Sequence, residues 1–176
     1  MMTAVVAAAV LLAIVAGAIL VLAARKPDTF RVARAASIKA PPEKIFPLIG
    51  DLHSHLSWSP FEKDPAMKRS FNGADKGKGQ VYAWDGNRQV GSGRIEITDA
   101  KPDRVTMKLD MLRPIKASND VEFTLAPNGD MTVVTWAMRG RQPFIAKVMS
   151  TVINCDKMVG GQFEQGLARL KSLAEA

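Results

Sequence analysis

The chain opens with an unbroken apolar run. Every residue from Ala4 to Ala24 is apolar, and as a helix this run spans about 31 Å, enough to cross the hydrocarbon core of a bilayer. Basic side chains begin abruptly after the run with Arg25 and Lys26, whereas the α-amino group is the one positive charge before it. Because basic flanks favour the cytoplasmic side, the pattern predicts a single-pass membrane helix followed by a cytoplasmic domain. Residues 1–27 are then the anchor and junction, and residues 28–176 are the domain.

A cleaved secretory signal is the main alternative to an anchor. The segment Met1-Met2-Thr3 offers no basic region, and the apolar run is longer than the usual core of a signal peptide. Small-residue patterns such as Val21-Leu22-Ala23 still allow cleavage. An uncleaved anchor is therefore favoured, and the signal stays open as the alternative.

The rest of the chain combines helix and strand patterns. Phe30–Ile38 alternates weakly and predicts a first strand, and two short helical segments follow it, ended by Gly50 and Pro60. From Met67 onward, about six strands are separated by short turn sequences, which implies antiparallel neighbours. Phe144–Glu175 has the apolar spacing of one long amphipathic helix. This order predicts a domain of the α+β class.

The alternation along the strands predicts which side chains face the core. No carboxylate falls on the apolar face of these strands, so we expect no general acid or base there and do not favour an enzyme. Asn119 shares the parity of Val121 and is either a group that orients a ligand or a solvated strand end, the latter being favoured. The apolar face takes Ile95, Ile97, Val105, Met107, Leu109, Met111, Val121, Phe123 and Leu125, and the wet face takes Arg94, Glu96, Asp110 and Glu122.

Length, charge and cysteine content bear on domain count and partners. The 176 residues carry a formal net charge of +7, and the part that remains after the anchor suits one domain with one core. Cys155 is the only cysteine, so the chain has no internal disulfide. No aromatic-basic signature accompanies the lysines, so nucleic acid is not an expected partner. The oligomeric state is left open by the sequence.

Two short motifs and a glycine pair are candidates for special roles. His53 and His55 lie two positions apart, where side chains on a helix point in different directions, so we predict no metal site and assign both to capping or to the surface. Gly77-Lys78-Gly79 lacks the ending and spacing of a phosphate loop and predicts a turn. Gly160 and Gly161 weaken the C-terminal helix, and either close packing or space for a ligand explains them.

Four segments carry a family resemblance. They are Ser37-Ile38-Lys39-Ala40-Pro41-Pro42-Glu43-Lys44-Ile45-Phe46, Trp58-Ser59-Pro60-Phe61-Glu62-Lys63, Thr135-Trp136-Ala137-Met138 and Asp156-Lys157-Met158-Val159-Gly160-Gly161-Gln162-Phe163-Glu164-Gln165-Gly166-Leu167. Together they resemble the START-like superfamily of helix-grip proteins, also called SRPBCC or polyketide cyclase-like. The last segment looks like a mostly uncharacterised bacterial branch in which a membrane helix precedes the domain. The resemblance runs from about Phe30 to the C-terminus.

The resemblance implies an antiparallel sheet curled around the C-terminal helix, with an elongated apolar cavity between them. Relatives use this cavity for lipids, sterols, quinones, polyketides or plant hormones, while others catalyse cyclisation or dehydration, or bind partner proteins. We therefore expect a membrane-tethered protein that binds a hydrophobic small molecule such as a lipid or quinone. An enzyme of the polyketide cyclase or dehydratase type and a protein-interaction module are the alternatives.

No catalytic residue is carried over by the resemblance, and no cofactor is implied. The expected cavity wall is aromatic and aliphatic, and ordinary core packing is the alternative role for each of its members. The residues expected to line it are Trp58, Tyr82, Trp84, Met107, Leu109, Phe123, Trp136, Met138, Met149, Val152 and Val159.

Overall fold

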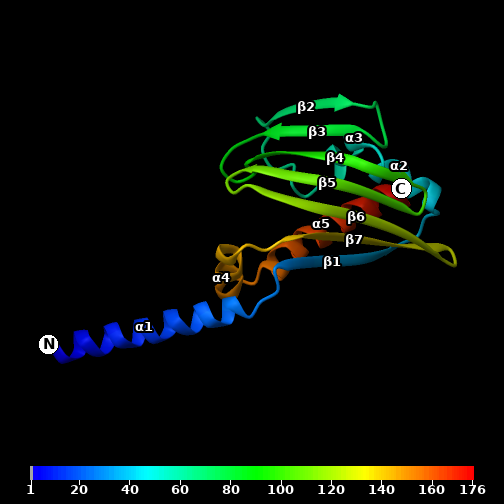
Figure 1. The fold of residues 1–176 in the computed structure, drawn as a ribbon. Coiled ribbons are helices and arrows are strands. Elements are labelled where there is room, and N and C mark those ends of the chain that lie inside the picture. The colour runs from blue at the N-terminus through cyan, green and yellow to red at the C-terminus, as the bar shows by residue number, and fades with distance from the viewer. Residues whose placement is uncertain (1) are drawn as a thin grey trace.

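A curved sheet wraps around a C-terminal helix, and an N-terminal helix projects from one end of it (Figure 1). The structure is a computed structural model that describes residues 2–176. The helices are α1 (Met2–Ala24), α2 (Pro42–Ile49), α3 (Leu52–Trp58), α4 (Phe144–Val152) and α5 (Cys155–Glu175). The strands are β1 (Thr29–Ile38), β2 (Lys68–Gly73), β3 (Gln80–Asp85), β4 (Ser92–Lys101), β5 (Arg104–Arg113), β6 (Ala117–Asn128) and β7 (Met131–Arg141).

Helix α1 is apolar on all sides and largely exposed along its length. Its segment Val5–Ala24 is long and apolar enough to cross a membrane. A secretory signal near an N-terminus has similar properties, so the expected single-pass anchor and cytoplasmic domain remain predictions.

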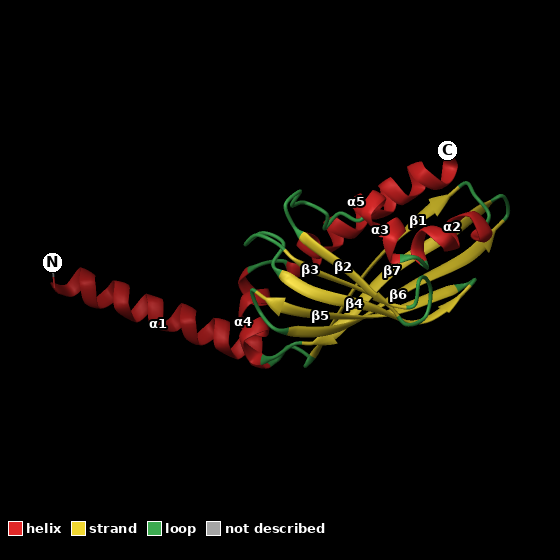
Figure 2. Cartoon of the chain, turned by 90° about the horizontal axis from the view of Figure 1, so that it is seen from above, coloured by secondary structure: helices red, strands yellow, loops and turns green. Residues whose placement is uncertain are grey.

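The seven strands form one antiparallel sheet in the order β1-β7-β6-β5-β4-β3-β2. Helices α2, α3 and α5 gather on one face of this sheet (Figure 2). The predicted α+β class and helix-grip architecture are confirmed. Strands β2 to β7 follow one another as neighbours. Strand β1 is the edge strand next to β7, so the start of the domain lies beside its last strand.

Local sequence explains the two short helices that bridge β1 and β2. Pro42 is the first residue of α2, where its missing N–H costs nothing, and Gly50 ends that helix. The carboxylate of Asp51 then caps α3 by accepting a hydrogen bond from the backbone N–H of His53 at 2.9 Å. These helices bury their apolar residues in the same core as α5. The largest buried side chains of the core include Ile38, Ile45, Ile49, Leu52, Trp58, Phe123, Phe163, Leu167 and Leu170.

The long C-terminal helix predicted for Phe144–Glu175 is wrong as a single element. It is divided between α4 and α5, because Ile153 adopts an extended backbone conformation and the side chain of Asn154 accepts a hydrogen bond from the N–H of Lys157 at 2.9 Å. Asparagine is a strong helix-capping residue, so a new helix begins there although the apolar spacing continues.

The glycine pair in α5 does not border the cavity wall. A Cβ atom at Gly160 would collide with the guanidinium of Arg34, which crosses the helix to reach Glu164 at 2.8 Å and Asp156 at 2.9 Å. At Gly161 a Cβ would meet nothing within 4 Å. Close packing therefore explains Gly160, and neither glycine makes space for a ligand.

Candidate functional site: an apolar internal cavity

A cavity of about 450 Å³ lies between the sheet and α5. Strands β3 to β7 supply the largest share of its wall, and α3, α5 and two loops supply the rest. This volume falls within the range of small-molecule sites. The wall is overwhelmingly apolar, so a bound molecule would exchange water for aromatic, aliphatic and thioether groups.

The sheet contributes every second residue to the wall, as the pleat requires. Neighbouring strands place these residues opposite one another, so that Tyr82 faces Ile95, Ile95 faces Leu109, and Leu109 faces Asn119 across the sheet. The polar residues between them lie on the opposite face, where Arg94 bonds the carboxylate of Glu96 at 2.6 Å. The predicted inward and outward parity of these strands is confirmed by the pairing.

An aromatic cluster forms the wall where the sheet meets α3 and α5. The ring of Trp136 stacks on Phe163 with centroids 4.2 Å apart, and Trp58 meets Trp136 edge-on at 5.6 Å. The indole N–H of Trp58 donates to the carbonyl of Leu48 at 2.8 Å, which fixes the ring against α2. Such rings present a large apolar surface to the cavity.

One carboxylate reaches the cavity from a loop. Glu62 follows α3, and it accepts a hydrogen bond from the Tyr82 hydroxyl at 2.6 Å and from Arg69 Nε at 2.9 Å. Burial, followed by the hydrogen bond and charge of Glu62, raises the pKa of Tyr82 well above its ordinary value. The phenol therefore stays protonated at neutral pH.

His55 is a buried member of the wall. Its Nε2 lies 2.8 Å from the carbonyl oxygen of Ile49, so the proton sits on Nε2 and is donated to that carbonyl. Burial lowers the pKa of His55 to about 4, against the raising effect of the Ile49 hydrogen bond. The imidazole is neutral at pH 7, and the predicted assignment of His55 to capping or the surface is wrong.

Asn119 is also buried and lines the cavity, so the favoured interpretation as a solvated strand end is wrong. Its side chain lies over Gly140, the residue opposite it on β7, where a Cβ atom would collide with the amide oxygen. The glycine thus makes room for the amide. Among the described residues, no protein partner is bonded to this side-chain amide, which leaves it available to a polar group of a ligand.

The mouth of the cavity lies between two loops and the first turns of α5. Phe61, Gln89 and Met158 line the cavity and are exposed to solvent. Lys63 Nζ donates to Gln162 Oε1 at 2.8 Å across this opening. A separate hollow of about 280 Å³ lies on the other face of the sheet, but charged and polar side chains line much of it and make it mainly polar.

Most of the residues expected to line the cavity do lie on its wall. They are Trp58, Tyr82, Trp84, Met107, Leu109, Phe123, Trp136, Met138 and Val159. Met149 and Val152 do not, because they belong to the separate helix α4 and point to solvent. Their placement in the cavity followed from the single long helix and fails with it. Ligand binding by the other nine residues stays a prediction.

The two residues that could hold a metal have structural partners instead. His53 stacks on Phe71 with centroids 4.0 Å apart, and its Nδ1 lies 2.9 Å from Gln80 Nε2. Across residues 2–176, no group of three or more histidine, cysteine, aspartate or glutamate side chains is arranged to hold a metal ion. The segment Gly77-Lys78-Gly79 lies in the β2–β3 turn, as predicted.

A curved antiparallel sheet that grips a helix over an apolar cavity defines the helix-grip class of proteins. The family model described as polyketide cyclase / dehydrase and lipid transport matches residues 29–175, and the chain belongs to this family. No curated protein sequence matches the chain.

Solved structures share the fold at low sequence identity. A protein from Chromobacterium violaceum is 17% identical, with a TM-score of 0.58 over 85% of this chain and 99% of its own. The Aha1 dimer from Colwellia psychrerythraea is 17% identical, with a TM-score of 0.58 over 83% and 96%. The di-domain ARO/CYC BexL from the BE-7585A biosynthetic pathway is 16% identical, with a TM-score of 0.64 over 88% and 53%. At these identities the similarity establishes the fold alone.

Proposed function

We propose that the protein is held at a membrane by α1 and binds a hydrophobic small molecule, such as a lipid or quinone, in the cavity. The observation that carries this proposal is the wall itself, in which aromatic, methionine and aliphatic side chains surround about 450 Å³ of space. The description of the family, which includes lipid transport, supports a ligand of this class.

The polar groups of the wall suggest which kind of hydrophobic molecule fits. Asn119 offers an amide to the cavity, while the Tyr82 hydroxyl is already donated to Glu62. A mostly apolar molecule with one hydroxyl or carbonyl group would satisfy Asn119 and bury the rest of its surface against the aromatic cluster. A lipid with a small head group has this character, and a quinone would present one of its two carbonyl groups to Asn119.

A tether would give such a protein a steady supply of ligand. In this proposal residues 1–27 anchor the chain and residues 28–176 form the binding domain. Arg25 and Lys26, which follow the apolar helix, favour a domain on the cytoplasmic side. Attachment raises the effective concentration of the cavity near the bilayer without any new contact.

Mass spectrometry of the detergent-extracted full-length protein tests the proposal. We expect a lipid or quinone to remain bound through purification and to be absent from a variant whose cavity is filled. Membranes washed with carbonate should retain the full-length protein, whereas a chain beginning at Pro27 should be soluble. Release of the full-length protein by high salt alone would contradict a spanning helix. Purified protein that never carries or takes up an apolar molecule would contradict ligand binding.

An enzyme is the second candidate, and the Glu62–Tyr82 pair is the observation that favours it. A carboxylate and a phenol 2.6 Å apart on the cavity wall are groups that can move a proton to or from a bound molecule. The family description includes polyketide cyclases and dehydrases. If the co-purified molecule is converted to another species by the protein but not by Glu62→Gln, the enzyme interpretation replaces simple binding. No observation at the cavity favours the third alternative, a protein-interaction module.

A further inference from the structure

Helix α4 has its polar and apolar faces reversed. Ile145, Met149 and Val152 are 65%, 43% and 69% exposed, and their spacing puts them on one side of the helix. Lys147, in contrast, is buried, and Ser150 is turned toward the protein. A surface helix in water normally turns its apolar side to the core. The apolar stripe of α4, defined by Ile145, Met149 and Val152, therefore faces the surroundings without a partner in the described chain.

Hydrogen bonds hold α4 in this orientation against the end of α1. Lys26 Nζ donates to the carbonyl of Ser150 at 2.6 Å and to its hydroxyl at 3.0 Å. Lys147 Nζ, whose side chain is 9% exposed, bonds the carboxylate of Asp28 at 2.5 Å. The N–H of Gln142 also donates to the carbonyl of Asp28 at 2.7 Å. Rolling the stripe inward would break these hydrogen bonds.

The end of β5 and the β5–β6 turn add two apolar side chains, Leu112 and Ile115, at the same end of the sheet. Leu112 and Ile115 are 54% and 62% exposed. Strand pairing brings this turn near the base of α4, because β6 pairs Asn119 with Gly140 close to the end of β7, from which α4 departs. Figure 1 likewise shows this turn at the end of the sheet from which α1 projects. Exposed apolar side chains of α1, α4, β5 and the β5–β6 turn thus gather at one end of the domain.

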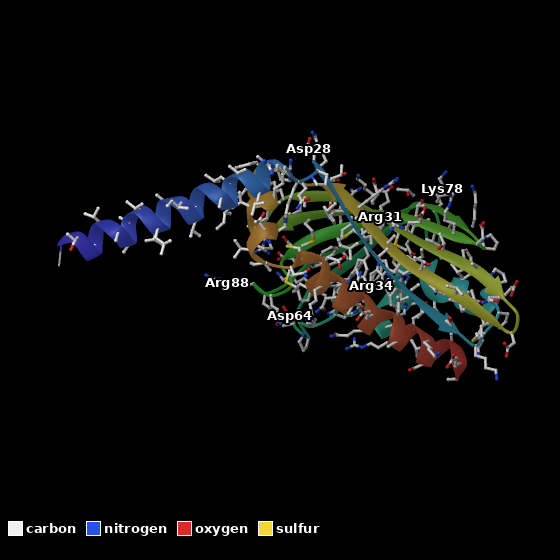
Figure 3. All side chains as sticks on the ribbon, turned by 90° about the horizontal axis from the view of Figure 1, so that it is seen from below. Asp28, Arg31, Arg34, Asp64, Lys78 and Arg88 are labelled. Atoms are coloured by element: carbon white, nitrogen blue, oxygen red, sulfur yellow. The ribbon has the colours of Figure 1, made fainter. Side chains whose placement is uncertain are left out.

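Basic residues accompany this surface. Arg25 follows α1, Lys116 lies in the β5–β6 turn and Arg141 ends β7, and all three are exposed. Figure 3 shows Arg88 at the same end as Asp28, whereas Lys78 lies at the far end of the sheet. Exposed apolar side chains with basic neighbours are the combination that attracts and enters an anionic lipid surface.

The mouth of the cavity opens beside this surface. Met158, in the first turn of α5, lines the cavity and is itself exposed. The loop that carries Arg88 also provides Gln89 and Val90 to the wall. We propose that α4 and the β5–β6 turn dock on the anionic bilayer surface beside α1, with the apolar stripe among the outer acyl groups. The cavity mouth then opens at the lipid interface. This docking rests on the proposed function in one respect, namely that α1 holds the protein at a bilayer.

Spin labelling of the full-length protein tests the docking. With Cys155 replaced by serine, a nitroxide is attached at Val152→Cys or at Leu173→Cys, an exposed position near the C-terminal end of α5. The protein is reconstituted into vesicles of phosphatidylcholine and phosphatidylglycerol. We expect the label at position 152 to collide readily with oxygen and poorly with a water-soluble nickel chelate, and the label at 173 to show the reverse. The contrast should shrink in vesicles of phosphatidylcholine alone and be lost in Ile145→Asp/Met149→Asp.

Two results would overturn the docking. Equal access of nickel to both labels would show that the apolar stripe stays in water. Poor access of both oxygen and nickel to position 152 would show that a second copy of the chain covers it. Ligand retention in detergent is expected to survive Ile145→Asp/Met149→Asp, because neither side chain lines the cavity. Loss of ligand with docking intact, or release by carbonate, would instead count against the proposed function.

Discussion

Gly166 of α5 packs against the indole ring of Trp136 on β7. A Cβ atom at Gly166 would lie 2.7 Å from Trp136 Cζ3 and 2.9 Å from Pro60 Cδ, both far inside normal contact. The absence of a side chain lets the helix approach the sheet closely enough for Phe163 to stack on Trp136. The glycine therefore sets the position of the aromatic cluster at the cavity wall.

Gly166→Ala is expected to lower the free energy of unfolding by about 1 to 3 kcal/mol, because the added methyl overpacks the site. Alanine favours a helix over glycine by about 1 kcal/mol, which this overpacking has to exceed. Gly161→Ala is the matched control, since a Cβ there meets nothing within 4 Å, and it should stabilise the domain. Denaturant unfolding followed by circular dichroism measures both. Equal stability of the two variants would contradict the close packing.

The buried imidazole of His55 predicts a pH dependence of stability. Its pKa is about 4 in the folded protein and about 6.5 in an unfolded chain, so between these values the unfolded state binds more protons. The contribution of His55 is complete above about pH 6.5 and is lost as the pH falls toward 4, up to about 3 kcal/mol. Unfolding free energies measured across this window should have a slope that His55→Gln removes. If the slope persists in His55→Gln and disappears in His53→Gln, the pH dependence does not come from His55 and the prediction is wrong.

A bulky residue at the cavity wall should exclude a ligand without unfolding the domain. Val159 lines the cavity from the second turn of α5 and is only partly buried, so Val159→Trp can extend into the empty volume. We expect its thermal midpoint to remain close to that of the parent and its bound apolar molecule to be absent by mass spectrometry. Ile153→Trp, outside the cavity, is the control and should retain the molecule. A Val159→Trp protein that keeps its ligand would move the binding site elsewhere.

The ion pair between Asp28 and Lys147 should hold α4 in place. Lys147 lowers the pKa of Asp28 through its hydrogen bond and its charge, so this carboxylate is ionised at neutral pH. Asp28→Asn is expected to loosen α4 and to speed proteolysis within residues 142–154, as mapped by mass spectrometry of the full-length protein in detergent. Asp130→Asn, which affects an exposed pair with Lys39 at 3.8 Å, should leave the cleavage rate unchanged.

The period of two along the strands made much of the cavity predictable. Once Leu109 and Phe123 are placed on the apolar face, pleating fixes the direction of their neighbours two residues away, and no tertiary information is needed. The same parity placed Asn119 inward. Its burial was misjudged because the sequence does not reveal that Gly140, on the adjacent strand, leaves room for the amide.

Groups on loops and short helices were missed for a different reason. Glu62 follows α3 in an irregular segment with no periodicity, so only the folded chain brings it to Tyr82. His55 does lie on a helix, but its burial depends on the docking of α3 against α2 and the sheet. Met149 and Val152 were misplaced because helical spacing alone cannot distinguish an apolar stripe that faces the core from one that faces outward, as it does on α4.

All three tryptophans of the chain, Trp58, Trp84 and Trp136, line the same cavity. They come from three different elements, α3, β3 and β7, so they surround the volume from several sides. The intrinsic ultraviolet emission of the unlabelled protein therefore originates entirely from the cavity wall. An apolar molecule that enters the cavity changes the surroundings of these indoles, so we expect the wavelength and intensity of the emission to report its binding. Binding elsewhere on the surface should leave the emission unchanged.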